Sequence, residues 1–372
     1  MSKSLGTIWP LEPHTAKKHE ILKRYFDAWL PILATTNLQV IYIDGFAGPG
    51  VYSGGEDGSP VIVLKSALGH KYKPATEFCC LFVEADKKRY DHLTSVLDAL
   101  SPSLPTNIKY QTAHTTFDNK ISSILDELDQ KRQALFPTLA FIDPFGFKHT
   151  PFETIARLMT HPKCEVLVNF MYEEINRFLG LPDYAKTFDE LFGCPDWRGA
   201  LELSTSEEKV AATRDLYLRQ LQKVARYARS FEMINRGNRV DYFLYFATDN
   251  LLGLRRMKEA MWRVDPTGEF QFSDMTDASH QLLLAFASSP NFEPLREMIV
   301  AAFGGLEIEI SALEQWVVTD TPYLPTHLRK PILEPMEDDG SLTVISPNPK
   351  RRRHTYPTGT VLKFATPIFQ LR

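Results

Sequence analysis

The chain has 372 residues and a mass of 42.5 kDa, with 44% apolar residues and a formal net charge of −4. This length predicts one large domain and a smaller second one, and the charge excludes a uniformly basic nucleic-acid-binding protein. Because no run of about 18 apolar residues and no secretory signal occurs, we expect a cytoplasmic protein that is not bound to a membrane. The spacing of the cysteines is not that of metal ligands, so we predict free thiols and no metal site. The cysteines are Cys79, Cys80, Cys164 and Cys194.

Two hydrophobic periods alternate along residues 14–264. Stretches with three- and four-residue steps, typical of helices, are followed by short apolar runs typical of buried strands. The predicted helices are 14–33, one that begins at Ser59, 86–99, 118–132, 151–160, 205–229 and 252–264, and the predicted strands are 38–43, 78–83, 107–112, 138–142, 165–170 and 242–247. Such β-α units in series predict an α/β fold with a Rossmann-like, doubly wound, mostly parallel sheet.

The first strand runs into the loop Asp44-Gly45-Phe46-Ala47-Gly48-Pro49-Gly50. Glycine tolerates positive φ and has no Cβ, so such a loop brings bare backbone N–H groups close to a nucleotide-like ligand. The spacing resembles the first motif of S-adenosylmethionine-dependent methyltransferases more than Gly-x-Gly-x-x-Gly. The alternative is an ordinary βα turn in which the aspartate stabilises the loop. The predicted cofactor contacts in this loop are Asp44, Gly45, Phe46, Gly48 and Gly50.

Further cofactor contacts are predicted after the next two strands. Glu84 ends the second strand, where a carboxylate can accept hydrogen bonds from ribose hydroxyls, while Asp86 suits a helix cap. Phe117 and Asp118 follow the third strand, where an adenine ring and its amine would be held. Asp118 could equally be a helix cap. We assign Glu84, Phe117 and Asp118 to cofactor binding.

The fourth strand ends in Asp143-Pro144-Phe145-Gly146. Amino-methyltransferases of nucleic acids carry Asp/Asn-Pro-Pro-aromatic at this place, where an acceptor and a proline-fixed carbonyl hold an exocyclic amine and the ring stacks on a flipped base. The segment is similar to the motif of tRNA guanine-N2 dimethyltransferases, so Asp143, Pro144 and Phe145 are the predicted catalytic residues. A simple Asp-Pro turn is the alternative. Asn169 is a further candidate contact, with a strand-end amide bonded to the loop backbone as its alternative. His14, Lys17 and Lys18 could approach the cofactor, and an exposed helix start is the alternative for them.

The rest of the chain predicts an insertion and a second domain. Within a domain of residues 1–288, residues 169–240 are expected to form a helical insertion over the cleft at the carboxyl edge of the sheet. Residues 289–372 show helical patterns at 294–303, 311–318 and 325–333 and strands at 341–345 and 359–364. Three small helices and a two-stranded wing predict a winged-helix-like domain.

The C-terminal segment is basic. Residues 327–372 contain eight Lys/Arg against four Asp/Glu. Consecutive cations repel one another unless an anion lies near, and duplex phosphates are suitable anions. A solvated basic turn is the alternative. The predicted nucleic-acid contacts are Lys350, Arg351, Arg352 and Arg353 at the tip of the wing, with Arg329 and Lys330 on the third helix.

Several segments together resemble the three-Cys-motif partner (TcmP) family of bacterial proteins over most of residues 8–290. The resemblance implies a methyltransferase-like fold and an association with a neighbouring radical S-adenosylmethionine protein, whose cysteines give the family its name. The segments are His14-Thr15-x-x-Lys18, Tyr42–Gly50, Gly58–Pro60, Phe141–Gly146 and Lys258–Pro266.

Two functional hypotheses remain. In the first, the protein uses S-adenosylmethionine to methylate an amine of a nucleic-acid base; no strong base is needed, because the methyl sulfonium is already activated and positioning supplies most of the rate. In the second, the protein is a non-catalytic partner: the winged helix binds DNA and the sheet domain is a scaffold for the radical enzyme. The departure from the Pro-Pro-aromatic pattern favours the second hypothesis.

Overall fold

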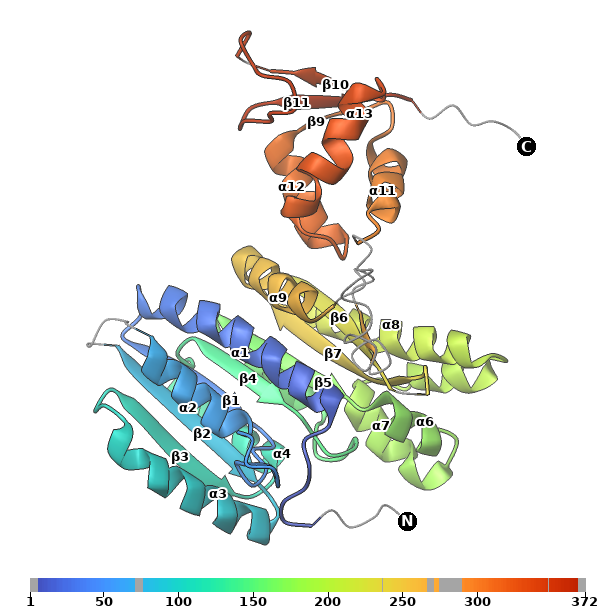
Figure 1. The fold of residues 1–372 in the computed structure, drawn as a ribbon. Helices are drawn as coiled ribbons and strands as arrows, with labels where there is room; N and C mark the ends of the chain where they lie inside the picture. Colours follow the sequence, from blue (N-terminus) through green and yellow to red (C-terminus); the bar gives the residue numbers. More distant parts are fainter. Residues whose placement is uncertain are drawn as a thin grey trace. The chain divides into compact units, whose positions relative to one another are not determined.

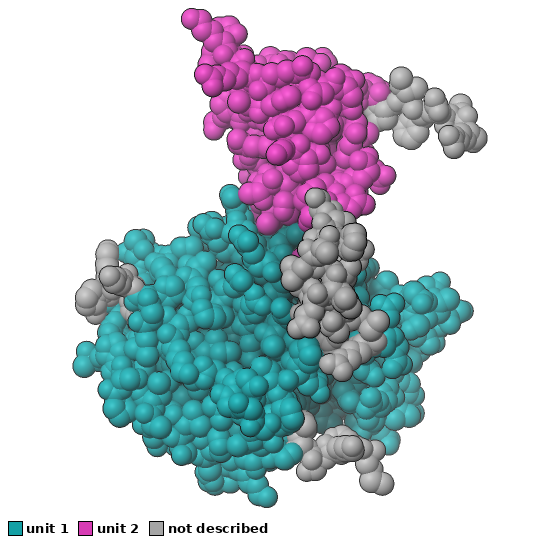
Figure 2. All heavy atoms as spheres, in the orientation of Figure 1, with its two compact units in different colours: residues 1–264, 271–284 teal, residues 265–270, 285–372 magenta. Residues whose placement is uncertain are grey.

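The computed structural model describes residues 6–70, 76–235, 237–265, 271–273, 290–346 and 348–366. The chain divides into two compact units, residues 1–264 with 271–284, and residues 265–270 with 285–372 (Figure 2). The predicted domain boundary between residues 288 and 289 lies outside the described residues, as does Pro347 in the basic segment. Within the described ranges, no helix is long and apolar enough to cross a membrane.

An eight-stranded sheet forms the centre of the first unit (Figure 1). The spatial order of its strands is β3-β2-β1-β4-β5-β7-β6-β8. The first five strands in this order are parallel to one another, and β7 is antiparallel to its neighbours β5 and β6. The strands are β1 (Gln39–Asp44), β2 (Glu77–Glu84), β3 (Ile108–His114), β4 (Thr138–Ile142), β5 (Cys164–Phe170), β6 (Tyr227–Ile234), β7 (Val240–Thr248) and β8 (Gln271–Ser273). The predicted Rossmann-like, methyltransferase-like fold is confirmed.

Helices cover both faces of this sheet (Figure 1). On one face α1 contacts both α2 and α9, and on the other α4 contacts α5. Local signals set their starts: Pro13 opens α1, and the side chains of Asp86 and Thr116 cap α3 and α4. The helices are α1 (Pro13–Ala34), α2 (Ser59–Gly69), α3 (Lys87–Leu100), α4 (Phe117–Lys131), α5 (Phe152–Met159) and α9 (Leu251–Val264).

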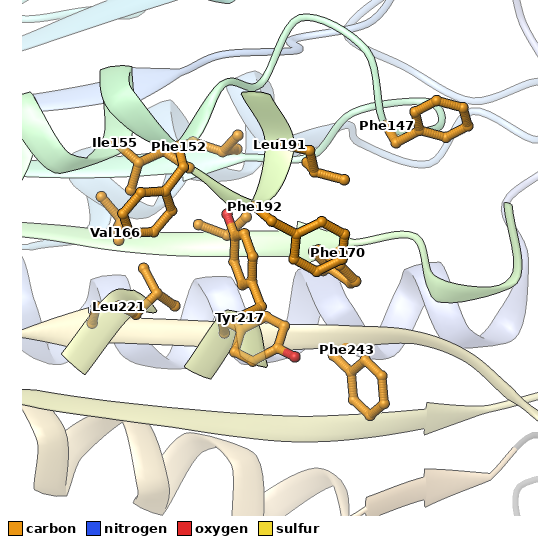
Figure 3. Close-up of a cluster of buried hydrophobic side chains, with 14 of the residues drawn as sticks. Phe147, Phe152, Ile155, Val166, Phe170, Leu191, Phe192, Tyr217, Leu221 and Phe243 are labelled. Carbon is orange, nitrogen blue, oxygen red and sulfur yellow. The ribbon is translucent and has the colours of Figure 1, made fainter. Parts of the chain in front are cut away.

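Aromatic side chains fill the core on the second face (Figure 3). The ring of Phe170 lies 4.6 Å from that of Tyr217 and 5.6 Å from that of Phe192 between centroids. Much of this core comes from the helices after β5, which are α6 (Tyr172–Phe178), α7 (Ala185–Phe192) and α8 (Ser206–Val224). The helix predicted over 205–229 ends at Val224. The segment 169–240 was predicted to be a helical insertion, but it contains β6, which is a strand of the sheet.

The described residues of the second unit form three helical segments and a small antiparallel sheet of order β10-β11-β9. The helix predicted at 325–333 is a 3₁₀ turn followed by a π-helical turn that leads into α13, and the strand β9 was not predicted. The bounds are α11 (Glu293–Phe303), β9 (Glu307–Glu309), α12 (Ile310–Asp320), α13 (Glu334–Asp338), β10 (Leu342–Ile345) and β11 (Val361–Phe364). The winged-helix-like fold of this unit stays a prediction.

The contact between Gly45 and Phe117 predicts a local stability effect. A Cβ on residue 45 would lie 2.5 Å from Cδ2 of the fully buried Phe117 ring. Gly45→Ala should therefore lower the free energy of unfolding by about 1–3 kcal/mol, because the ring must move within a packed core. Urea unfolding measures the change. Gly69→Ala is the control, since a Cβ there meets no atom within 4 Å; equal stability of the two variants would contradict the proposed overpacking.

Candidate functional site

The candidate site lies where the order of the sheet reverses, at the carboxyl ends of β1 and β4. In doubly wound sheets ligands bind at this switch point. The glycine loop that follows β1 turns sharply, with φ of +63° at Gly48 and +85° at Gly50. The carbonyl oxygen of Gly50 then accepts a 2.8 Å hydrogen bond from the N–H of Gly58, which brings the loop back to the start of α2. The glycines thus give the loop the conformation that the sequence predicts.

Four backbone N–H groups of this loop, those of residues 45 to 48, are already hydrogen-bonded. Those of Gly45 and Ala47 donate to the carbonyl oxygens of Phe141 and Val83, each at 2.9 Å. The N–H of Phe46 donates to Asp44 Oδ1 at 3.3 Å, and that of Gly48 donates to Glu84 Oε2 at 2.9 Å. The expectation of bare N–H groups is therefore wrong for these four residues, because strand ends and carboxylates accept their hydrogen bonds.

Glu84 lies beside the glycine loop, as predicted for a ribose contact. Its Oε1 accepts a 2.7 Å hydrogen bond from the N–H of Asp86, and its Oε2 accepts the bond from Gly48. Each carboxylate oxygen has a second lone pair, so both keep capacity for another donor. Asp86 accepts from the N–H of Arg89 at 3.0 Å, which confirms it as the cap of α3.

Phe117 and Asp118, the predicted adenine contacts, have partners within the protein. The Phe117 ring is fully buried in the core and stacks on Phe46 with centroids 6.0 Å apart. The Asp118 carboxylate accepts hydrogen bonds from the hydroxyls of Ser122 and Thr154. Packing between the sheet, α4 and α5 occupies both side chains, and Gly45 is a glycine because Phe117 lies against it.

Asp143 makes a partly buried ion pair with Lys18 of α1. The Nζ atom lies 2.7 Å from Oδ1 and 2.6 Å from Oδ2, and Lys18 is 5% exposed. Asn169, at the end of β5, donates from Nδ2 to Oδ1 at 2.6 Å. Of the two other predicted catalytic residues, Pro144 is buried, whereas Phe145 is 52% exposed. The structure therefore brings Asp143, Asn169 and Lys18 together and leaves the Phe145 ring accessible.

Two buried groups at the site have shifted pKa values. Burial raises the pKa of Asp44 to about 7; hydrogen bonds from Ser59 and Phe46 oppose this, and the nearby carboxylates of Asp143 and Glu84 add to it. Burial and the adjacent Lys18 ammonium lower the pKa of His19 to about 4. The imidazole is therefore neutral at pH 7, and its buried Nδ1 has no hydrogen-bond partner in the described part of the chain.

A small cavity of about 30 Å³ lies under the glycine loop, with His19 and Asp143 among its lining residues. The Trp9 and Phe145 rings line it and meet edge to face with centroids 5.0 Å apart, and the Arg89 guanidinium lies 4.9 Å from each ring; we name these three side chains the cap. The carbonyl oxygen of Trp9 accepts a 2.9 Å hydrogen bond from the N–H of Ser53. Sequence reasoning missed Trp9, His19 and Arg89, because no motif contains them.

Three of the six predicted nucleic-acid cations have carboxylate partners. Arg351 pairs with Glu337, Arg353 pairs with Asp338 at 2.5 Å, and Arg329 pairs with Glu314 at 3.2 Å. The other three, Lys330, Lys350 and Arg352, are exposed.

No family model and no curated protein matches this chain. It resembles several solved structures, among them a protein of Legionella pneumophila (14% identity, covering 63% of this chain and 85% of that chain, TM-score 0.39). Others are the spermidine synthase of Thermotoga maritima (14%, 74% of each chain, 0.34) and precorrin-6y C5,15-methyltransferase of Geobacter metallireducens (10%, 67% and 93%, 0.30). At these TM-scores the likenesses decide nothing about activity, and the resemblance to the three-Cys-motif partner family stays a prediction.

The raised pKa of Asp44 predicts a pH-dependent stability. Its folded-state pKa of about 7 lies above the ordinary 3.8, so the folded protein binds this proton more tightly, and the stabilisation is lost as pH rises towards 7. Asp44→Asn removes this loss. Between pH 5 and 8, the free energy of unfolding of the variant should rise relative to wild type by about 2–3 kcal/mol, measured in urea. A difference that is constant with pH would contradict the shift.

Proposed function

We propose that the protein is an S-adenosylmethionine-dependent methyltransferase that acts on an exocyclic amine of a nucleic-acid base and works with a three-Cys-motif radical S-adenosylmethionine protein. The strand order, a glycine loop at the switch point and an acidic residue at the end of β2 support the first part. The Asp-Pro-Phe-Gly segment supports the base amine, and the resemblance of the sequence supports the partner.

The observation that carries the proposal is the gathering of carboxylates at three adjacent strand ends. Asp44, Glu84 and Asp143 end or follow β1, β2 and β4, and after burial the carboxylates of Asp143 and Glu84 contribute to the raised pKa of Asp44. Lys18 pairs with Asp143. The remaining negative potential favours a cationic ligand, and S-adenosylmethionine carries a sulfonium and an ammonium group.

The chain's own residues supply binding and orientation. The cofactor, when bound, supplies an activated methyl group. Glu84 would accept hydrogen bonds from the ribose hydroxyls, and Asp44 would hold the amino end. Asp143 would orient the target amine, and the accessible ring of Phe145 would stack on the base.

The size of the cavity sets a condition on binding. A cavity of about 30 Å³ has room for about one water molecule, whereas ligand pockets measure about 300 Å³ or more. The cofactor must therefore displace the cap formed by Trp9, Arg89 and Phe145. The carboxylate acceptors fit the cofactor's ribose and ammonium groups, and the space for it requires this movement.

A second candidate function is a non-catalytic, DNA-binding scaffold for the radical enzyme. Specific observations favour it: Lys18 and Asn169 already engage the Asp143 carboxylate, and the loop amides are bonded within the chain. The exposed cations Lys350 and Arg352 support phosphate binding.

Calorimetry with S-adenosylmethionine tests the first candidate. Wild type should bind it, and Glu84→Gln should weaken binding about tenfold or more, because charged hydrogen-bond acceptors for the ribose are lost. Glu77→Gln is the matched control: Glu77 begins the same strand and pairs with Lys109 at the opposite edge of the sheet. Absence of heat at millimolar ligand with folded wild type would exclude the methyltransferase proposal.

Anisotropy of a labelled DNA duplex over a salt series tests the second candidate. Replacing Lys350 and Arg352 together with Gln should weaken binding and make the slope of log K against log salt shallower by about 2, because two phosphate contacts are lost. Lys186→Gln, at a 91% exposed side chain on α7, is the control and should leave the slope unchanged. A wild-type protein that does not bind the duplex at low salt would exclude this candidate.

A further inference from the structure

A second and larger cavity, which we name the α1–α9 pocket, lies at the amino-terminal edge of the sheet. It measures about 440 Å³ and is bounded by α1 and α9, which lie side by side (Figure 1). Glu165 near the start of β5 and Thr248 at the end of the antiparallel β7 mark this edge. None of its lining residues is shared with the cavity under the glycine loop.

Its polar end is a buried carboxylate that has hydroxyl partners. Glu165, 6% exposed, accepts hydrogen bonds from Tyr25 Oη at 2.5 Å and from Thr248 Oγ1 at 2.6 Å. Among the described residues, the main influences on its ionisation are burial, hydrogen bonds from Thr248, Tyr25 and Trp29, and the Asp249 carboxylate; none of them is a cation. A buried carboxylate without a cation is costly to ionise, and burial raises the pKa of Glu165.

The two cations that line the pocket have other partners. Lys163 Nζ donates to Asn37 Oδ1 at 2.9 Å, and Arg256 pairs with Glu259 at 2.6 Å. Neither neutralises Glu165. The carboxylate also repels an anionic ligand from the polar end of the pocket.

The wall of the pocket is largely apolar. Ile32 and Leu252 are 39% and 42% exposed, and Trp29 and Leu33 also line it. Trp29 is 4% exposed, and a hydrogen-bonding interaction of its indole with Glu165 acts to lower the pKa of that carboxyl, against the effect of burial. The apolar wall therefore adjoins the carboxylate end of the pocket.

We propose that the α1–α9 pocket binds a small amphipathic amine, with its ammonium group against Glu165 and its apolar body against Trp29, Leu33 and Leu252. An ammonium supplies the counter-charge that Glu165 lacks, and the carboxylate has lone pairs left for it after the two hydroxyl bonds. The volume lies within the range of small-molecule sites. This site is independent of the proposed methyltransferase function.

The test compares phenethylamine with 2-phenylethanol, which carries a hydroxyl in place of the ammonium group. Binding to the full chain is followed by intrinsic tryptophan fluorescence and by the shift in melting temperature. Wild type should bind the amine at least tenfold more tightly than the alcohol, and Glu165→Gln should abolish this preference. Glu77→Gln, at the same edge of the sheet, should keep it.

If Glu165→Gln does not fold, Trp29→Phe serves as the second variant. It keeps an aromatic wall and should weaken the fluorescence response to the amine, while the comparison of amine and alcohol on wild type still decides the charge requirement. Equal affinity for the two compounds, an unchanged preference in a folded Glu165→Gln protein, or no response of wild type to millimolar phenethylamine would each overturn the proposal.

Discussion

The site at the switch point depends on how the protein accommodates negative charge in a buried place. The charge of each carboxylate there is accommodated in a different way. Asp143 pairs with Lys18, Glu84 accepts hydrogen bonds from two backbone N–H groups, and the pKa of Asp44 is raised to about 7. An unpaired buried carboxylate would cost several kcal/mol, so these arrangements are not optional. They also fix the glycine loop, because the carboxylates that need donors are the groups to which Phe46 and Gly48 donate.

The same interactions determine whether a ligand can bind more easily beside Glu84 or beside Asp143. Glu84 can accept bonds from ribose hydroxyls on its remaining lone pairs while it keeps the bond from Gly48, so no hydrogen bond has to be broken there. The cation–π contacts of Arg89 with the cap are worth about 0.5–2 kcal/mol. Removing Lys18 from Asp143 costs about 3–5 kcal/mol. Cofactor binding therefore fits this architecture more easily than a substrate that must displace Lys18.

Local patterns identified most elements of the first unit, and contacts distant in sequence decided what remained hidden. The strand predicted at 38–43 is β1, yet nothing local shows that Gly45 accommodates Phe117 rather than a ligand. Strand β6 was missed because its half-buried alternation directly follows a polar helix. The Lys18–Asp143 pair joins residues 125 positions apart, and the pairing of Arg351 with Glu337 likewise needs the folded chain. Glycine spacing locates the loop but does not reveal which groups face it.

Helix α1 forms a wall of both cavities, which has consequences for how substitutions act. Lys18 and His19 belong to the site at the switch point, and Trp29 lines the α1–α9 pocket, about 16 Å further along the helix axis. Between them, Leu22 and Phe26 are fully buried against the sheet. Moving α1 would require these side chains to leave a close-packed core, which costs more than rotating one surface ring. Each cavity is therefore expected to adapt through its own side chains, with the helix backbone held in place between them.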